Sequence, residues 1–337
     1  MKKSIFLGTL TAASFAAGLA AAGTMEDVQA KGFLQCGVST GLVGFAAPDA
    51  NGNWDGFDVS VCRAVAAAVL GDPQAVKFTP TTGKTRFTAL ASGEVDMLAR
   101  NTTWTFSRDV DLKFEFVGVN YYDGQGFMVP KELGVSSAKD LDGATVCIQT
   151  GTTTELNLAD FFRSNNISYE PVPIETNAEA QQQYLAGACD VYTTDASGLA
   201  ATRASFEDPS AHVVLPEIIS KEPLGPLVRH GDNQWGDVVR WTLNALISAE
   251  ELGITSANLA EMAKGTNNPE INRMMGTEGD LGGMLGLDKE WAQRALAGGN
   301  YGEIFERNIG EATAIGLARG LNAKWTDGGL IYSPPFR

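Results

Sequence analysis

The chain contains the same succession of strands and helices twice, and this repeat limits the possible folds more than any other feature. The first unit has expected strands at 33–38, 76–80 and 95–99 and expected helices at 57–70 and 84–91. The second unit has expected strands at 145–148, 167–172 and 189–192 and expected helices at 153–163 and 178–186. Strands that alternate with helices indicate parallel βαβ units. We therefore expect an α/β protein in which each unit is a mostly parallel sheet flanked by helices.

The two units also share a local pattern at matching places. Residues 90–96 and 185–190 each contain the end of a helix, a glycine cap and a strand that begins near an aspartate. Two matched units of this kind predict a two-lobed clamp with a ligand between the lobes.

The N-terminus has the three parts of a Sec signal peptide. Lys2 and Lys3 form a basic start, residues 5–19 are apolar and uncharged, and residues 20–23 (Ala-Ala-Ala-Gly) supply small residues for cleavage. We expect a signal peptide over 1–22, cleavage after Ala22 and export to the periplasm. No cysteine stands at the cleavage site, so a lipoprotein anchor is not expected.

The composition limits the number of domains and the kinds of partner. About 315 residues remain after cleavage, enough for two domains with cores of their own. The formal net charge is −15, and removal of Lys2 and Lys3 makes it −17, which argues against a basic nucleic-acid-binding face. With two histidines and no Cys-x-x-Cys pair, the sequence predicts no metal site, and we expect no cofactor.

Four cysteines, Cys36, Cys62, Cys147 and Cys189, allow three disulfide connectivities. The first two lie on the first strand and first helix of the first unit, and the other two lie on strands of the second unit. We expect Cys36–Cys62 and Cys147–Cys189, because each bridge then stays within one lobe and such bridges persist in an oxidising compartment. The alternative is four reduced structural thiols.

A candidate ligand site follows the third strand of the first unit. The stretch 96–109 leaves a buried strand, passes through a threonine-rich turn and reaches Arg108 in the first turn of an expected short helix. Ligands of open α/β sheets bind beyond the carboxyl ends of the strands. Hydroxyl groups and a forked guanidinium suit a carboxylate. The alternative is a surface arginine after an ordinary turn.

Several stretches resemble one known family. Thr105 and Arg108 resemble the Thr-x-x-Arg signature of the polar amino-acid-binding proteins that serve ABC importers. The stretches 56–59, 100–105 and 149–156, with the tail 325–337, resemble the general L-amino-acid-binding subfamily. The resemblance covers essentially the whole mature chain. By it the chain is identified as a member of the bacterial extracellular solute-binding proteins of family 3.

The resemblance implies a type II periplasmic-binding-protein fold, a Venus-flytrap clamp of two lobes joined by a hinge. Residues 23–123 would form the first part of lobe 1, residues 124–223 lobe 2, and residues 224–337 the return to lobe 1 with a C-terminal extension. The hinge crossings would lie in 121–126 and 221–226.

The resemblance also implies which groups hold the α-carboxylate of an amino acid. Arg108 would grip it, helped by Thr103 and by the backbone near Asn101. This set belongs to lobe 1.

On lobe 2, Thr152 follows Thr150 and starts a helix whose free N–H groups would face the same carboxylate. The spacing from Thr152 to Glu155 predicts a capping box, and the alternative for Thr152 is a plain helix cap. Asp195, at the end of a strand, would hold the ligand's ammonium group. The alternative for Asp195 is a turn or cap residue.

Ligand selectivity would depend on residues beyond these. Arg86 matches the position at which binders of acidic amino acids carry a second arginine, Arg100 is another cation near the cleft, and Thr176 would line its far side. Two further arginines favour Glu, Asp, Gln or Asn as ligands. The alternative is that Arg86 is an exposed helix residue and that Arg100 pairs with a neighbouring carboxylate.

The function implied is binding of L-amino acids in the periplasm and delivery to an ABC permease, by a monomer that is not an enzyme. A dehydratase-like enzyme on the same fold is one alternative. It would need a general acid or base over the substrate, and no histidine is expected near the cleft. The other alternative is a sensor that presents the bound ligand to a receptor.

Overall fold

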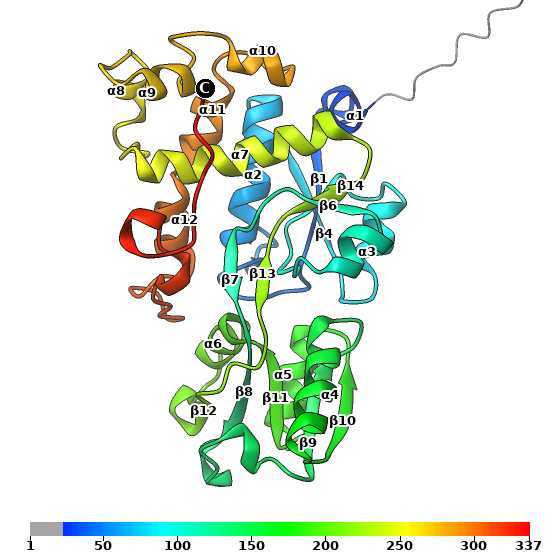
Figure 1. The fold of residues 1–337 in the computed structure, drawn as a ribbon. Helices are drawn as coiled ribbons and strands as arrows, with labels where there is room; N and C mark the ends of the chain where they lie inside the picture. Colours follow the sequence, from blue (N-terminus) through cyan, green and yellow to red (C-terminus); the bar gives the residue numbers. More distant parts are fainter. Residues whose placement is uncertain (1–22) are drawn as a thin grey trace, which may run out of the picture.

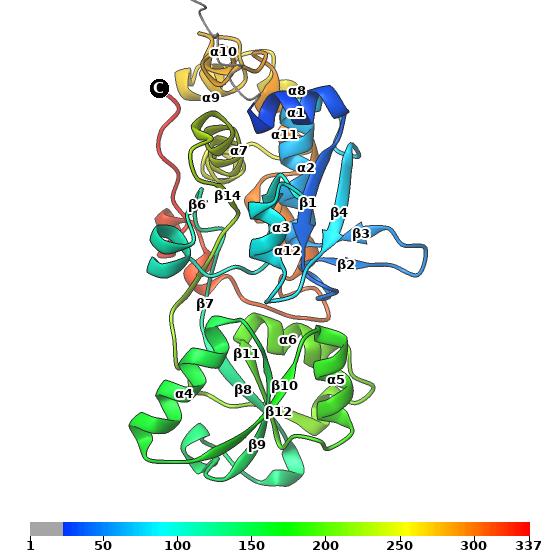
Figure 2. The same cartoon turned by 90° about the vertical axis from the view of Figure 1, so that its right-hand side faces the viewer.

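The computed structural model describes residues 23–337, and the predicted signal peptide (1–22) lies outside the described residues. Figure 1 shows two lobes joined by a narrow connection. Figure 2 shows helices α4 (Thr153–Asn165) and α5 (Asn177–Leu185) on opposite sides of the sheet of lobe 2. No helix within the described part of the chain is long and apolar enough to cross a membrane.

Lobe 1 is built on a five-stranded sheet with the order β4-β1-β5-β14-β6. Its strands are β1 (Leu34–Val38), β4 (Val76–Pro80), β5 (Met97–Leu98), β6 (Phe114–Phe116) and β14 (Leu227–Arg229). β1 pairs in parallel with β4 and β5, whereas β14 is antiparallel to β5 and β6. The other elements are α1 (Thr24–Lys31), α2 (Phe57–Leu70), α3 (Arg86–Ala91), the π-helical turn η1 (Ser107–Asp111), α7 (Asn233–Glu251) and the hairpin β2 (Ala47–Pro48) and β3 (Trp54–Asp55).

Lobe 2 repeats this topology with the order β10-β9-β11-β8-β12. Its strands are β8 (Gln125–Pro130), β9 (Ala144–Gln149), β10 (Tyr169–Ile174), β11 (Val191–Asp195) and β12 (His212–Val214). Its helices are α4 (Thr153–Asn165), α5 (Asn177–Leu185) and α6 (Ala196–Ala204), with short turns η2 (Lys131–Leu133), η3 (Ala138–Asp140) and η4 (Pro209–Ala211). β9 is parallel to β10 and β11, and β8 is antiparallel to β11 and β12. The predicted pair of α/β lobes is confirmed.

Two short strands connect the lobes. β7 (Tyr121–Asp123) and β13 (Glu222–Leu224) form an antiparallel pair in which Glu222 lies opposite Asp123. Pro223 lies opposite Tyr122, and its carbonyl accepts a hydrogen bond from the N–H of Trp104 at 2.8 Å. A proline is tolerated there because opposed residues in an antiparallel ladder alternate between bonded and non-bonded pairs.

The C-terminal extension packs on lobe 1 and forms one core with it. Its elements are α8 (Leu259–Met262), α9 (Pro269–Met274), α10 (Leu281–Leu285), α11 (Trp291–Ala295), η5 (Leu296–Gly298), α12 (Tyr301–Asn308), η6 (Gly320–Asn322) and η7 (Trp325–Asp327). α11 and α12 pack against α2, which also contacts β1 and α7. The alanine-rich α2 is therefore buried on nearly all sides, as expected for a helix without a polar face.

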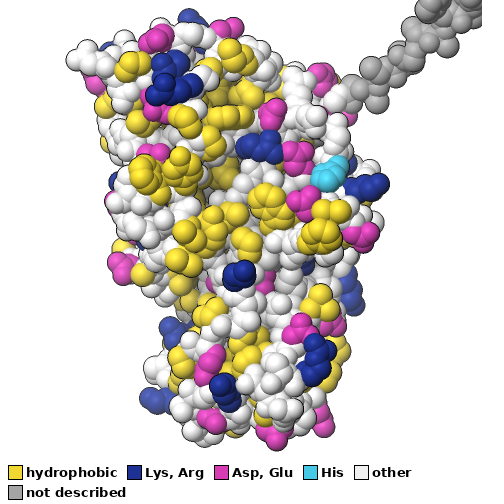
Figure 3. Space-filling view, viewed as in Figure 1, with side chains coloured by type: hydrophobic (Ala, Val, Ile, Leu, Met, Phe, Trp, Pro, Cys, Tyr) yellow, Lys and Arg dark blue, Asp and Glu magenta, His cyan; other side chains and the backbone are white. Residues whose placement is uncertain are grey.

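The extension also reaches the hinge. The Asn322 side chain accepts a hydrogen bond from the N–H of Tyr122 at 2.6 Å and donates one to its carbonyl at 3.1 Å. On the face seen in Figure 3, the basic side chains are dispersed among acidic ones.

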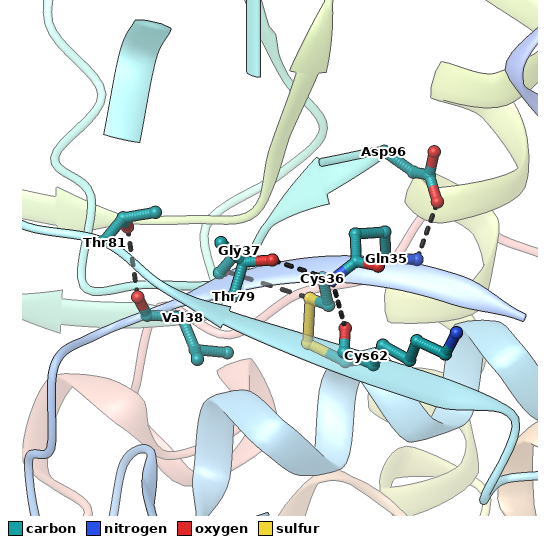
Figure 4. Close-up of a disulfide and its surroundings, with 9 residues drawn as sticks. Gln35, Cys36, Gly37, Val38, Cys62, Thr79, Thr81 and Asp96 are labelled. Carbon is teal, nitrogen blue, oxygen red and sulfur yellow. Dashed lines mark hydrogen bonds between the residues drawn. A yellow bond between two sulfur atoms is a disulfide. The ribbon is translucent and has the colours of Figure 1, made fainter. Parts of the chain in front are cut away.

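Both predicted disulfides are present. Cys36 of β1 is bonded to Cys62 of α2, and Cys147 of β9 is bonded to Cys189, just before β11. Figure 4 shows the first bridge joining β1, which lies between β4 and β5, to the helix α2. Each bridge lies within one lobe, so neither restrains the hinge.

Candidate ligand-binding site

A polar cavity lies between the lobes and encloses about 500 Å³, including its part open to solvent. Lobe 1 contributes Ser39, Leu42, Arg86, Arg100, Asn101 and Thr103. Lobe 2 contributes Gln149, Thr152, Thr153, Thr154, Asn177, Thr194, Asp195 and Gly198. Nearly all of these residues carry hydrogen-bonding side chains, so the cavity suits a small polar solute rather than an apolar one.

The lobes are closed around this cavity. The hydroxyl oxygens of Thr103 in lobe 1 and Thr153 in lobe 2 lie 3.4 Å apart. At the rim, Lys84 Nζ lies 2.8 Å from Glu175 Oε1 of the other lobe. Both side chains of this rim pair are about half exposed, so the ion pair contributes little to holding the lobes together.

Two of the predicted arginines line the cavity. Arg86 is 2% exposed, its Nη1 donates to Thr102 Oγ1 at 3.3 Å, and its Nε has no hydrogen-bond partner among the described residues. Arg100 is 7% exposed, and its Nε donates to the carbonyl of Thr81 at 3.1 Å. The structure contradicts the alternative that Arg86 is an exposed helix residue. The α3 helix turns the guanidinium inward over the cleft, where a buried donor needs a partner.

Arg86 and Arg100 are charged side chains that are almost fully buried from solvent. Burial lowers the pKa of Arg86 well below its usual value, and the charges of Arg100 and Arg108 lower it further. Burial, followed by the charge of Arg108, lowers the pKa of Arg100 to about 10. The repulsion among the three guanidinium groups would be relieved by a bound anion.

The cavity also carries acceptors for a cation. Asp195 ends β11 and precedes α6, to which its side chain makes no capping bond. Burial, then the charges of Asp123 and Glu222, raises the pKa of the Asp195 carboxyl well above its usual value. Asn101 has a φ of +40°, which is strained for a residue other than glycine, and its buried Oδ1 has no hydrogen-bond partner among the described residues. Asp195 and Asn101 are therefore suited to an ammonium group.

The start of α4 differs from the expectation. The predicted capping box is wrong, because the Thr152 hydroxyl donates to the carbonyl of Gln149 at 2.6 Å and makes no cap. The Glu155 carboxylate accepts instead from the N–H of Gly151 at 3.1 Å. Thr152, Thr153 and Thr154 all line the cavity, so the N-terminal turn of α4, with its positive end of the helix dipole, faces the cleft.

Three of the predicted residues lie outside the cavity lining. Arg108 is 6% exposed, and its Nη1 donates to the carbonyl of Thr103 at 2.9 Å, directly behind the lining. The hydroxyl of Thr150 lies 3.4 Å from the carbonyl of Ile174 and donates to it. The hydroxyl of Thr176 caps α5 by accepting from the N–H of Glu179 at 3.1 Å.

The structure adds residues that the sequence analysis missed. Gln149 and Asn177, the neighbours of two predicted threonines, line the cavity and are joined by a hydrogen bond of 3.1 Å. Asp58, in the first turn of α2, is 3% exposed, and burial raises its pKa to about 7 although Asn101, Asn120 and Arg100 lower it. An acidic residue in the first turn of a helix was the available signal, but a cap or a dipole contact explains it equally well.

Two lobes closed around a cavity, with arginines on one lobe and an aspartate on the other, are typical of proteins that bind a small solute between two lobes. The model of the bacterial extracellular solute-binding proteins, family 3, matches residues 34–257, and the chain belongs to this family.

The chain is also similar along its full length to proteins with more specific names. It is 67% identical over 338 residues, covering all of both chains, to the glutamate/glutamine/aspartate/asparagine-binding protein BztA of Rhodobacter capsulatus. It is 59% identical over 342 residues, again covering both chains, to the general L-amino acid-binding periplasmic protein AapJ of Rhizobium johnstonii. The structure of an ABC transporter/periplasmic binding protein from Brucella ovis with glutathione bound is 58% identical, with a TM-score of 0.91, and the match covers 94% of this chain and 100% of that one.

Proposed function

We propose that the protein, exported by its signal peptide, binds polar L-amino acids in the periplasm as a monomer and delivers them to the membrane permease of an ABC importer. Glutamate, glutamine, aspartate and asparagine are the first candidates, within a ligand set that extends to other L-amino acids. The observation that carries the proposal is one cavity between two lobes that combines Arg86 and Arg100 with Asp195. An α-amino acid carries the anion and the cation that this combination complements.

In this proposal each ligand group has partners on named elements. The α-carboxylate is held between the N-terminal turn of α4 and the guanidinium of Arg108 or Arg100. The ammonium is held by Asp195. Arg86, whose Nε is buried without a partner among the described residues, takes a carboxylate or amide on the ligand's side chain. Burying a donor without a partner is unfavourable, so a ligand that supplies the acceptor is preferred over one that does not.

In this proposal the lobes close around the bound ligand, and the closed form is the one that the permease recognises. The ligand binds to the groups of one lobe, and its contacts with the other lobe then favour the closed clamp. The shift is limited by how much more tightly the ligand binds the closed form than the open form. X-ray scattering of the stripped protein should therefore show a more compact particle at saturating glutamate. Identical curves with and without glutamate would contradict closure.

Binding is favoured over catalysis because the relatives described above carry the names of binding proteins. In addition, binding of a zwitterion accounts for Arg86, Arg100 and Asp195 of the cavity, so none of them needs a catalytic role. The same two-lobed fold could instead serve a sensor that presents its bound ligand to a receptor. Copurification with a permease would support the transport role, and copurification with a receptor would support the sensor role.

The decisive measurement is calorimetry of ligand-stripped mature protein against the twenty L-amino acids. We expect Glu, Gln, Asp and Asn to bind, and glutarate, which lacks the ammonium, to bind poorly. Glutathione belongs in the panel because the Brucella ovis structure has it bound and because its γ-glutamyl end carries the same α-groups as glutamate. The proposal fails if none of the twenty amino acids binds.

A further inference from the structure

Glu222 is the first residue of hinge strand β13 and is 1% exposed. A carboxylate buried to this degree requires hydrogen-bond donors or a cation. Among residues 23–337, no nitrogen of a basic side chain lies within 4.0 Å of its oxygens. Its direct hydrogen-bond partners are therefore neutral side chains.

The donors come from both lobes. Oε2 of Glu222 accepts hydrogen bonds from the hydroxyls of Thr103 in lobe 1 and Thr153 in lobe 2, the latter at 3.0 Å. Oε1 accepts from Asn157 Nδ2 of α4 at 2.7 Å and from the Ser220 hydroxyl at 2.7 Å. The hydroxyl oxygens of Thr103 and Thr153, which belong to different lobes, lie 3.4 Å apart across the closed cleft. One oxygen of a hinge residue thus gathers a hydroxyl from each side of the cleft.

The number of hydroxyl protons fixes how the two threonines face a ligand. A hydroxyl has one proton and two acceptor lone pairs. Thr103 and Thr153 both direct their proton to Glu222, so each retains only lone pairs for another partner. Both residues line the cavity, on which Asp195 also borders. Because both hydroxyls donate to Glu222, they can only accept from a ligand and suit the ammonium rather than the carboxylate of an amino acid.

We propose that Glu222 is the latch of the clamp, a positioning residue that joins the lobes through Thr103 and Thr153 and turns both hydroxyls into acceptors for the ligand's ammonium. This inference rests on the proposed function for the identity of the ligand, but the latch itself follows from the lobe-to-lobe contacts. The latch forms on closure, after the ligand has arrived. Its loss should therefore accelerate ligand release and leave association nearly unchanged.

The test is Glu222→Gln, with L-glutamate as the probe. Glutamine has one acceptor oxygen where glutamate has two, so one of the two pairs of donors loses its acceptor. Hydrogen bonds to charged groups predict an affinity loss of roughly 10- to 100-fold. In stopped-flow fluorescence we expect the dissociation rate to rise by the same factor while the association rate changes by less than about twofold.

Glu175→Gln is the matched control, because it makes the same chemical change in another carboxylate that contacts both lobes. The Lys84–Glu175 pair is exposed, so the affinity should change by less than about fivefold. Equal effects of the two substitutions, or an unchanged dissociation rate in Glu222→Gln, overturn the latch.

A second pair of variants tests the latch even where Glu222→Gln fails to fold. Thr153→Val removes the hydroxyl and should accelerate release of L-glutamate, whereas Thr153→Ser keeps the hydroxyl and should restore slow release. Release from Thr153→Val at the wild-type rate overturns the latch. Wild-type protein that binds no amino acid would instead reject the proposed function, so the two failures are distinguishable.

Discussion

Arg86 and Arg108 are both buried arginines of lobe 1, yet their surroundings predict different roles. Arg108 donates to the carbonyl of Thr103, and in the proposed function its guanidinium is one of the two that could hold the α-carboxylate. Arg108→Ala should therefore weaken all amino acids alike, by roughly 100-fold or more. Arg86→Ala should weaken Glu and Asp more than Gln and Asn, because it removes the partner of a side-chain carboxylate. Calorimetry with the four ligands distinguishes the two patterns.

Arg163→Ala serves as the control for both variants, since Arg163 lies on α4 with its side chain 78% exposed. Proportional losses for all four ligands in Arg86→Ala would assign Arg86 to the α-carboxylate or to the scaffold.

Asp195 provides the corresponding test for the ammonium. Leaving one partner of a buried ion pair alone costs about 3 to 5 kcal/mol, which corresponds to an affinity loss of a hundredfold or more. Asp195→Asn should therefore bind every amino acid far more weakly while its ligand-free melting temperature stays close to that of wild type. Asp160→Asn, at an exposed position of α4, is the control. Near-normal glutamine affinity in folded Asp195→Asn would return Asp195 to the role of a strand-end residue.

The sequence located the cavity more accurately than it identified individual side chains. Arg86, Arg100, Asn101, Thr103, Thr152 and Asp195 were predicted and line the cavity. Thr150 and Thr176 each lie one residue from a lining residue, Gln149 and Asn177. Successive side chains of a strand point to opposite faces, and a threonine at the start of a helix has its own backbone partners. A motif therefore indicates the loop but leaves a one-residue ambiguity in what faces the ligand.

At the scale of elements, long and regular segments were predicted with accurate bounds. The helix at 57–70 and the strand at 76–80 coincide with α2 and β4, because an alanine-rich run stopped by glycine and an extended run ended by proline are strong signals. The short helices of the extension were not predicted. Segments of four to eight residues are unstable alone, and here packing on α2 and α7 rather than local propensity supports them.

Each disulfide joins two segments of one lobe and lies outside the cavity lining. Replacing Cys147 and Cys189 together by alanine, or Cys36 and Cys62 together, should lower the free energy of unfolding by roughly 3 to 4 kcal/mol, mainly by freeing the unfolded chain. None of the four cysteines lines the cavity, so glutamate affinity should be retained. Urea unfolding and calorimetry on the same samples test both statements. A large affinity loss in a folded variant would show that a bridge orients the binding groups.

At the scale of the whole molecule, buried carboxyl groups make stability depend on pH. Burial raises the pKa of Asp58 to about 7 and that of Asp123 to about 6, and it raises the pKa of Asp195 as well. The native state then holds more protons than the unfolded state above pH 4, so stability falls as the pH rises through this window. His212, whose pKa burial lowers, opposes the trend around pH 6.

We therefore expect the ligand-free protein to be more stable at pH 5 than at pH 8, by about 1.4 kcal/mol for each unit of net pKa shift. Glutamate affinity should change in the opposite direction, because the ammonium requires ionised Asp195. Thermal melts and calorimetry across this range test both trends. Stability that rises from pH 5 to pH 8 would contradict the raised pKa values of Asp58, Asp123 and Asp195.

The contact of Asn322 with Tyr122 covers an open edge of the hinge ribbon. Tyr122 lies opposite Pro223, so its N–H and carbonyl point away from β13, toward the outer side of the hinge ribbon. An open strand edge of this kind is a template on which another chain can add a strand. The amide of Asn322 satisfies both groups, one as acceptor and one as donor. Asn322 belongs to the tail that follows the family's common domain. Because its side chain occupies both backbone groups of Tyr122, a strand from a neighbouring molecule cannot pair with them.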